Sequence, residues 1–187
     1  MERQRPSHYG TWFADMLELL APDPEKTQVT GTPAEMTASA AREAFIVSSA
    51  ASLPPGPAGM LTLVPEFVAV TKIQVNLVYR IAKYYGKEGS VDRVTLLLVF
   101  GEVFGIGAGR IALREAERRL AARVLSERAG RTLVERLGAR TARRMALAGL
   151  GRWIPLVSAP VFGLIARSLT RKIGTHAQRH FSYPALP

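Results

Sequence analysis

Two histidines near the end of the chain have a spacing that is able to bind zinc. His176 and His180 lie four residues apart, so on a helix their rings would share one face. A zinc protease of the zincin type also needs a glutamate directly after the first histidine, where this chain has Ala177. The third histidine, His8, is remote in sequence. The pattern therefore favours two polar histidines near the chain end, and we expect no metal site.

Three polar residues stand among apolar neighbours and are the candidates for acid–base chemistry. Glu66 follows Pro65, Gln74 lies in the middle of an apolar stripe, and Glu102 lies in a glycine-rich segment. A carboxylate in apolar surroundings has a raised pKa, but catalysis also needs a second convergent group, which the sequence does not supply. We expect Glu66 to cap its own helix and pair with a basic group. We expect Glu102 to pair with Arg93 or with an arginine of the following helix.

Small residues at four-residue spacing predict close contacts between helices. They are Gly101, Gly105 and Gly109, and Gly163 repeats the spacing with Ala159. A dinucleotide-binding fingerprint that starts at Gly105 would need glycine at the position of Arg110. The spacing favours two helices packed inside one bundle over a glycine zipper in a membrane or between subunits. We expect no cofactor and no enzymatic activity.

Arginines form cationic ridges along two predicted helices. The residues of these ridges are Arg110, Arg114, Arg118, Arg119, Arg123, Arg136, Arg140, Arg143 and Arg144. Residues 110–144 contain 11 arginines and 4 glutamates, a net charge of +7. Arg167, Arg171 and Lys172 extend the charge in a basic tail. No aromatic residue lies between Phe104 and Trp153 to stack on bases, so nucleic acid is not the expected partner.

Charge is divided unevenly between the two halves of the chain. Residues 1–109 carry 9 Lys+Arg and 11 Asp+Glu, whereas residues 110–187 carry 16 and 4. A cationic half beside a neutral, apolar one predicts an anionic partner, either lipid headgroups or an acidic protein. The chain has no cysteine, which excludes disulfides, thiolate metal sites and thiol nucleophiles. The first ten residues lack the apolar run of a signal peptide.

Helical periodicity runs through the whole chain, and no segment alternates as a strand does. Residues 32–35 form a capping box that opens a helix to about Ser52, where Pro54, Pro55 and Gly56 stop it. A second helix runs from Glu66 to Tyr85 and ends at Gly86, and Ser90 caps the next. The fold is therefore expected to be all-α, with six or seven helices in one bundle.

Two apolar segments are interrupted by prolines. Residues 44–65 carry no charge and are long enough to cross a bilayer, but four prolines favour a helix–turn–helix elbow. The last apolar run, 153–166, is broken by Pro155 and Pro160 and precedes the basic tail. We expect these two elbows to pack against each other. Residues 1–31 are expected to form an amphipathic segment and a linker, and residues 32–187 the helical domain.

Two blocks of sequence resemble a known family. In the first, Leu53-Pro-Pro-Gly-Pro leads to the Pro65-Glu66 pair, then Gln74 and Tyr85-Gly86. The second block contains Ile154-Pro155, Gly163, Thr170, Ile173-Gly174, Ala177 and Phe181. Together they resemble the EcsC family and the related helical domain of some predicted bacterial membrane proteins, over roughly residues 35–181. The resemblance implies a helical, membrane-associated bacterial protein, linked in some members to ABC-transporter operons, and it carries no catalytic residues over.

These observations predict a non-enzymatic accessory protein of a bacterial membrane or transport system. It would lie in the cytoplasm, peripheral to the membrane, with its basic helices facing anionic lipid. The alternative is an interaction subunit of a larger assembly. In that case the glycine face and the segment around Trp12 and Phe13 would dock onto partner proteins or a second copy.

Overall fold

The computed structural model describes residues 8–23, 26–53, 61–103 and 155–182. Within these ranges the chain forms five α-helices, one short 3₁₀ helix and no strand, which confirms the all-α fold. Five is fewer than the six or seven helices expected, and the two expected between residues 110 and 150 lie outside the described residues. None of the described helices is both long and apolar enough to cross a bilayer.

Helix α2 (Pro33–Ala51) begins with the predicted capping box. The Thr32 hydroxyl accepts a hydrogen bond from the Glu35 backbone N–H at 3.3 Å, and the Glu35 carboxylate accepts one from the Thr32 backbone N–H at 2.7 Å. This second bond, together with one from the Thr32 hydroxyl, lowers the pKa of Glu35. The helix start predicted from the sequence is confirmed, because it depends only on neighbouring residues.

Helix α4 (Leu63–Tyr84) begins slightly before the predicted start, with Pro65 in its first turn, where a missing N–H is tolerated. Gly86, two residues beyond its last residue, stops the helix, and its φ of 64° lies in the left-handed region that favours glycine. The Lys87 N–H donates to the Ala82 carbonyl at 2.9 Å, which closes a Schellman motif. The predicted end of this helix is therefore confirmed.

The next helix does not begin as predicted. A 3₁₀ helix (η1, Glu88–Ser90) precedes α5 (Arg93–Val103). Asp92, not Ser90, caps α5, since the Asp92 carboxylate accepts a hydrogen bond from the Thr95 N–H at 2.7 Å. The Ser90 hydroxyl instead donates to the Lys87 carbonyl at 2.7 Å, within the 3₁₀ turn.

Helix α8 (Pro155–Ser182) corrects a second prediction. Pro155 and Pro160 were expected to break the last apolar run into an elbow, yet α8 is a single helix of 28 residues. Pro155 stands at the first helical position, where its fixed φ is favourable. Pro160 is only the sixth residue of α8 and removes a single hydrogen bond near the helix start. The apolar run and the basic tail are therefore two halves of the same helix.

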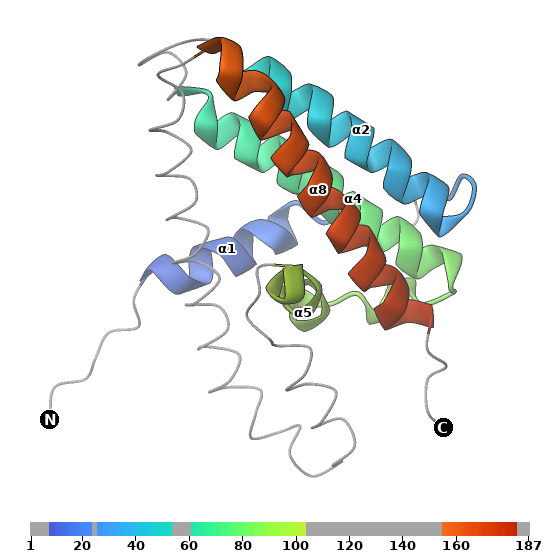
Figure 1. The fold of residues 1–187 in the computed structure, drawn as a ribbon. Helices are drawn as coiled ribbons and strands as arrows, with labels where there is room; N and C mark the ends of the chain where they lie inside the picture. The colour runs from blue at the N-terminus through green and yellow to red at the C-terminus, as the bar shows by residue number, and fades with distance from the viewer. Residues whose placement is uncertain (1–7, 24–25, 54–60, 104–154, 183–187) are drawn as a thin grey trace, which may run out of the picture.

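Helices α2, α4 and α8 lie side by side, with α4 and α8 parallel and α2 antiparallel to both (Figure 1). Helix α1 (His8–Leu19) lies against α4 and α5, and α5 lies against α8 (Figure 1). Fully buried side chains from all five described α-helices fill the core, among them Phe13, Leu17, Met36, Leu77, Ile81, Leu96, Phe100, Ile173 and Phe181. Helix α1 therefore packs its apolar face onto the same core as the helices that follow.

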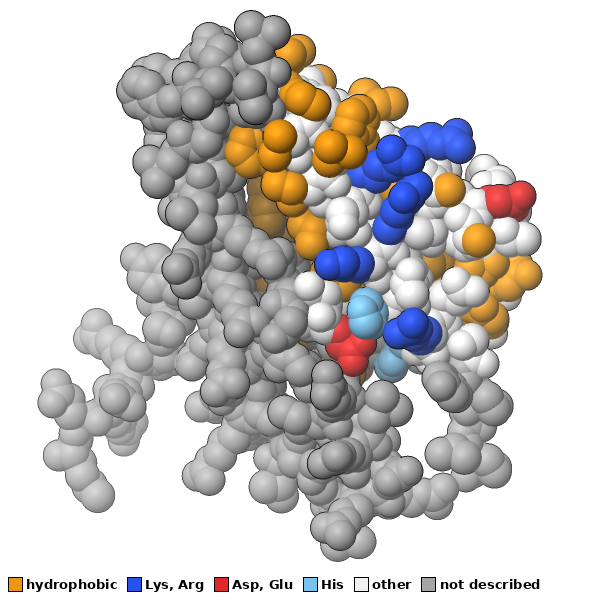
Figure 2. Space-filling view, viewed as in Figure 1, with side chains coloured by type: hydrophobic (Ala, Val, Ile, Leu, Met, Phe, Trp, Pro, Cys, Tyr) orange, Lys and Arg blue, Asp and Glu red, His pale blue; other side chains and the backbone are white. Residues whose placement is uncertain are grey.

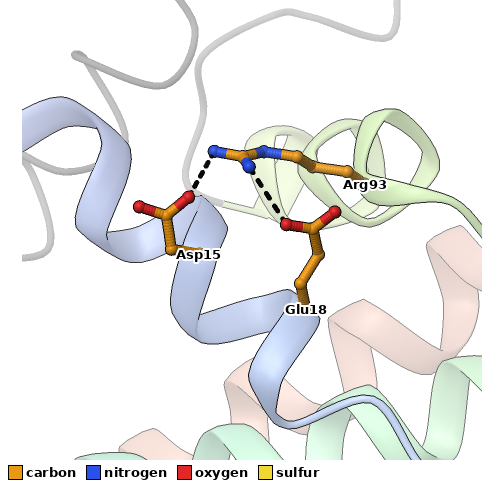
Figure 3. Close-up of polar contacts among 3 residues, drawn as sticks. All are labelled: Asp15, Glu18 and Arg93. Carbon is orange, nitrogen blue, oxygen red and sulfur yellow. Dashed lines mark hydrogen bonds and ion pairs between the residues drawn. The ribbon is translucent and has the colours of Figure 1, made fainter.

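The segment that follows α1 is fixed to α4. The Arg80 guanidinium donates to the Gln28 carbonyl at 3.1 Å and to the Thr30 hydroxyl at 2.7 Å. A second tie joins α1 to α5, where Arg93 pairs with Asp15 at 2.7 Å and with Glu18 at 3.0 Å (Figure 3). These polar contacts hold the N-terminal segment at both of its ends.

Candidate functional site

One face of α8 is exposed along its length and changes character halfway. Val161, Leu164 and Ile165 are exposed near its beginning. Arg171 and Lys172, about two helical turns further on, are exposed on the same face. The spacing of three, four and seven residues keeps these side chains in one stripe, so the face is apolar at one end and cationic at the other.

Exposed apolar side chains from two other helices lie at the end where α8 begins. Because α2 is antiparallel to α4 and α8, its last turns lie beside their first turns (Figure 1). Figure 2 shows the hydrophobic side chains gathered at this end of the visible face. We define the apolar end as Ile46, Leu53, Leu61, Val64, Val161, Leu164 and Ile165, whose exposed fractions range from 45% to 80%.

The other half of α8 carries four cations, which we call the cationic half. They are Arg167, Arg171, Lys172 and Arg179. Among the described residues, no carboxylate forms an ion pair with any of the four. The Nε of Arg167 is buried and has no hydrogen-bond partner in the same part of the chain. Within the described residues, these four charges are therefore not neutralised by a carboxylate.

The sequence identified three members of the cationic half and missed one. Arg179 was not selected, although it lies eight residues after Arg171, at a spacing that places it on the same helix face. The nine arginines predicted between residues 110 and 144 lie outside the described residues. Of the twelve cations predicted to contact an anionic partner, the described residues therefore include Arg167, Arg171 and Lys172.

A cleft of about 290 Å³ lies between α2 and the cationic half. Ala34, Thr37 and Ala38 of α2 form one wall, and the other consists of Arg171, Thr175 and Gln178 of α8. Gly174 lies beside this cleft, and an added Cβ there would come within 2.9 Å of the Thr37 Cβ. Small residues on both helices thus bring Arg171 next to a shallow cleft. Sequence reasoning did not find it, because its walls are distant in the chain.

Two of the polar residues predicted in apolar surroundings connect helices. Glu66 is half-buried and accepts a short hydrogen bond from the Ser48 hydroxyl, which joins α4 to α2. Gln74 is buried and donates to the Thr170 hydroxyl of α8 at 3.1 Å. Thr170 in turn donates to the Ala166 carbonyl at 2.8 Å. Both contacts stabilise the packing of the three long helices, since each satisfies polar groups inside the bundle.

Arg93 was one expected partner of Glu102, and the structure does not show that pair. Its carboxylate lies 2.5 Å from the Nδ1 of His176 on α8, and both side chains are partly buried. Arg93 is engaged on α1 instead, through Asp15 and Glu18. The expectation of Arg93 was wrong because Arg93, at the start of α5, faces α1, whereas Glu102, near the end of α5, faces α8. The alternative, an arginine of the following helix, lies outside the described residues.

A histidine ring that is held by a carboxylate is able to accept a proton from a neighbouring hydroxyl. Within the described ranges, however, no hydroxyl hydrogen-bonds to His176, and no group of three metal-ligating side chains occurs. Partial desolvation and the nearby Lys87 lower the pKa of His180, against the opposing effect of Glu102 and Asp92. This arrangement connects α5 to α8 and supplies no second catalytic group.

The glycines and prolines expected at helix contacts and turns, together with Tyr85, lie as follows. Gly163 lies against α2, where an added Cβ would come within 2.8 Å of the Phe45 ring. Gly101 is buried in α5, Tyr85 is partly buried, and Pro65 is exposed in the first turn of α4. Pro54, Pro55, Gly56, Gly105 and Gly109 lie outside the described residues. Gly163 thus makes its close contact inside this chain.

The model of the EcsC protein family matches residues 31–184. No curated protein and no solved structure matches the chain. The matched range covers every described helix except α1.

Proposed function

Because the chain belongs to the EcsC protein family, and its last helix carries cations with no ion pair among the described residues, we propose that it is a non-enzymatic accessory protein lying on an anionic membrane surface. It would act in a bacterial membrane or transport system, from the cytoplasmic side. The predicted helices between residues 110 and 150 would add their arginine ridges to this surface. Together with the five described α-helices, they would make seven.

The cationic half of α8 is the observation that carries this proposal. Each lysine or arginine near an anionic membrane contributes about 1 kcal/mol. Four such cations would therefore contribute on the order of 4 kcal/mol, close to a thousandfold in the partition coefficient. Salt weakens an attraction of this kind, because the charges involved are exposed. The proposal thus predicts binding that depends on both lipid charge and ionic strength.

Vesicle co-sedimentation tests the proposal directly. We expect the protein to pellet with vesicles that contain phosphatidylglycerol, to stay in solution with pure phosphatidylcholine, and to be released by raised salt. The double variant Arg171→Gln, Lys172→Gln is expected to bind about 30-fold more weakly, from two losses of about 1 kcal/mol each.

Two matched lysines provide the control. Lys172→Gln is expected to weaken binding about fivefold. Lys26→Gln removes another exposed charge, from the segment after α1, where Lys26 pairs with Asp23, and is expected to leave binding unchanged. Equal binding to neutral and anionic vesicles would refute the proposal, as would equal effects of the two substitutions.

A further inference from the structure

The apolar end brings together exposed side chains that the chain order keeps far apart. Ile46 and Leu53 come from the end of α2, Leu61 and Val64 from the beginning of α4, and the rest from the first turns of α8. Single exposed apolar side chains are common on protein surfaces, but seven at one end of a bundle mark an interaction surface.

Charges begin immediately beyond the apolar end. On α8, Arg167 follows Ile165 by two residues, and on α2, Arg42 precedes Ile46 by four. On α2, Glu43 is the exposed carboxylate nearest to the apolar end. Glu66, the carboxylate nearest to it on α4, is half-buried and bonded to Ser48. The charges beyond the apolar end are therefore all cationic on α8 and balanced on α2. This excess of positive charge matches an anionic lipid surface better than an acidic patch of one protein.

The spacing along α8 matches the layers of a bilayer surface. At about 1.5 Å per residue, Arg171 lies about 10 Å beyond Leu164 along the helix axis. Amphipathic elements bury their apolar part about 5–10 Å into the headgroup and acyl boundary. With Leu164 at that depth, Arg167 and Arg171 would lie at the level of the lipid phosphates, and their long side chains can extend further toward them.

We propose that the apolar end inserts into the acyl-chain layer of an anionic membrane while Arg167, Arg171 and Lys172 of the cationic half contact the phosphates. This inference rests on the proposed function and specifies its orientation: the bundle stands on one end, with α2, α4 and α8 entering the membrane surface together.

Site-directed labelling tests the orientation, since the chain has no cysteine to interfere. Leu164→Cys and Thr175→Cys place a probe at two exposed positions of the same face of α8. They are about 16 Å apart along the helix axis. With an environment-sensitive fluorophore, we expect vesicles containing phosphatidylglycerol to shift the Leu164 probe to the blue. Lipids with a nitroxide on the acyl chain should quench this probe and leave the Thr175 probe unquenched.

The outcomes separate this inference from the proposed function. If the protein pellets with anionic vesicles but both probes are quenched equally, or neither is, the insertion is refuted and peripheral binding stands. If the protein does not pellet, both fail. If the Leu164 probe shifts to the blue without vesicles and light scattering shows an oligomer, a protein partner covers the apolar end and the insertion is refuted.

A matched pair of leucines provides a second test without a label. Leu164→Ser is expected to lower binding to anionic vesicles severalfold, because about half of this side chain is exposed and would leave water on insertion. Leu19→Ser changes an even more exposed leucine on α1 and is expected to have no effect. Neither leucine is in the core, so both variants should fold. Equal binding of the two variants would refute the insertion.

Discussion

Replacing Gly174 with alanine tests the closest contact between α2 and α8. An added Cβ would lie 2.5 Å from the Cγ2 of Thr37 and 2.9 Å from its Cβ, with the hydroxyl closer still. Rotation of Thr37 can move its methyl and hydroxyl groups away. Its Cβ, however, is held by the backbone of α2. The two helices must therefore move apart to accept alanine at this position.

The expected loss of stability follows from two opposing effects. Alanine in place of glycine inside a helix gains about 1 kcal/mol. Overpacking of a close contact costs about 1–3 kcal/mol, and the backbone-fixed Cβ places this case at the upper end. The net loss should be about 2 kcal/mol, which corresponds to roughly 4–8 °C in Tm for a chain of this size.

Urea unfolding followed by circular dichroism measures this loss. Gly89→Ala is the control, because an added Cβ at Gly89 meets no atom within 4 Å. It should be neutral or slightly stabilising, since alanine reduces the entropy of the unfolded chain. Adding Thr37→Ala to Gly174→Ala should recover part of the loss by removing the hydroxyl and the methyl group. If Gly174→Ala is as stable as Gly89→Ala, the close packing of α2 on α8 is wrong.

Three further predictions concern the polar contacts between helices. Thr170→Val removes the acceptor of the buried Gln74 amide and should cost about 1–3 kcal/mol in urea unfolding, whereas Thr170→Ser should retain most of that stability. Arg93→Ala loses two partly exposed ion pairs with α1 and should cost at most about 1 kcal/mol, less at high salt in the same assay. The pKa of His180 is lower in the folded chain than its ordinary value of 6.5, so as the pH falls the unfolded chain binds this proton first. Stability should therefore decrease from about pH 6.5 down through the pKa of His180 in the folded chain. His180→Gln should flatten that part of the pH profile of thermal unfolding, and an unchanged profile would contradict the assignment.

Helix ends set by local chemistry were predictable from the sequence. The capping box at Thr32 and the glycine at Gly86 each act within a few residues, and both ends lie where their patterns placed them. Ser90 and Pro160 were misread for a related reason. Each carries a boundary signal, but Asp92 was a competing cap close by, and Pro160 lies too near the start of α8 to end it.

The partners of buried polar residues were not predictable. Glu102 was expected to pair with Arg93 or with an arginine of the following helix, yet its carboxylate contacts His176, more than seventy residues away. Thr170 as the partner of Gln74 was equally hidden, because periodicity shows which face of a helix is buried and not which helix covers it.

The sequence alone determined that the chain is helical, which family it resembles, and that its charge is concentrated in the second half, since these depend on composition and local spacing. Only the tertiary structure decided that the ends of α2, α4 and α8 meet. This antiparallel packing brings two separate uncharged runs to one end of the bundle and places the cations of α8 next to them. The physical reason is that helix pairing is set by long-range contacts, such as those of Gly163 and Gly174 on α8 with side chains of α2, and such contacts leave no periodic signal of their partner.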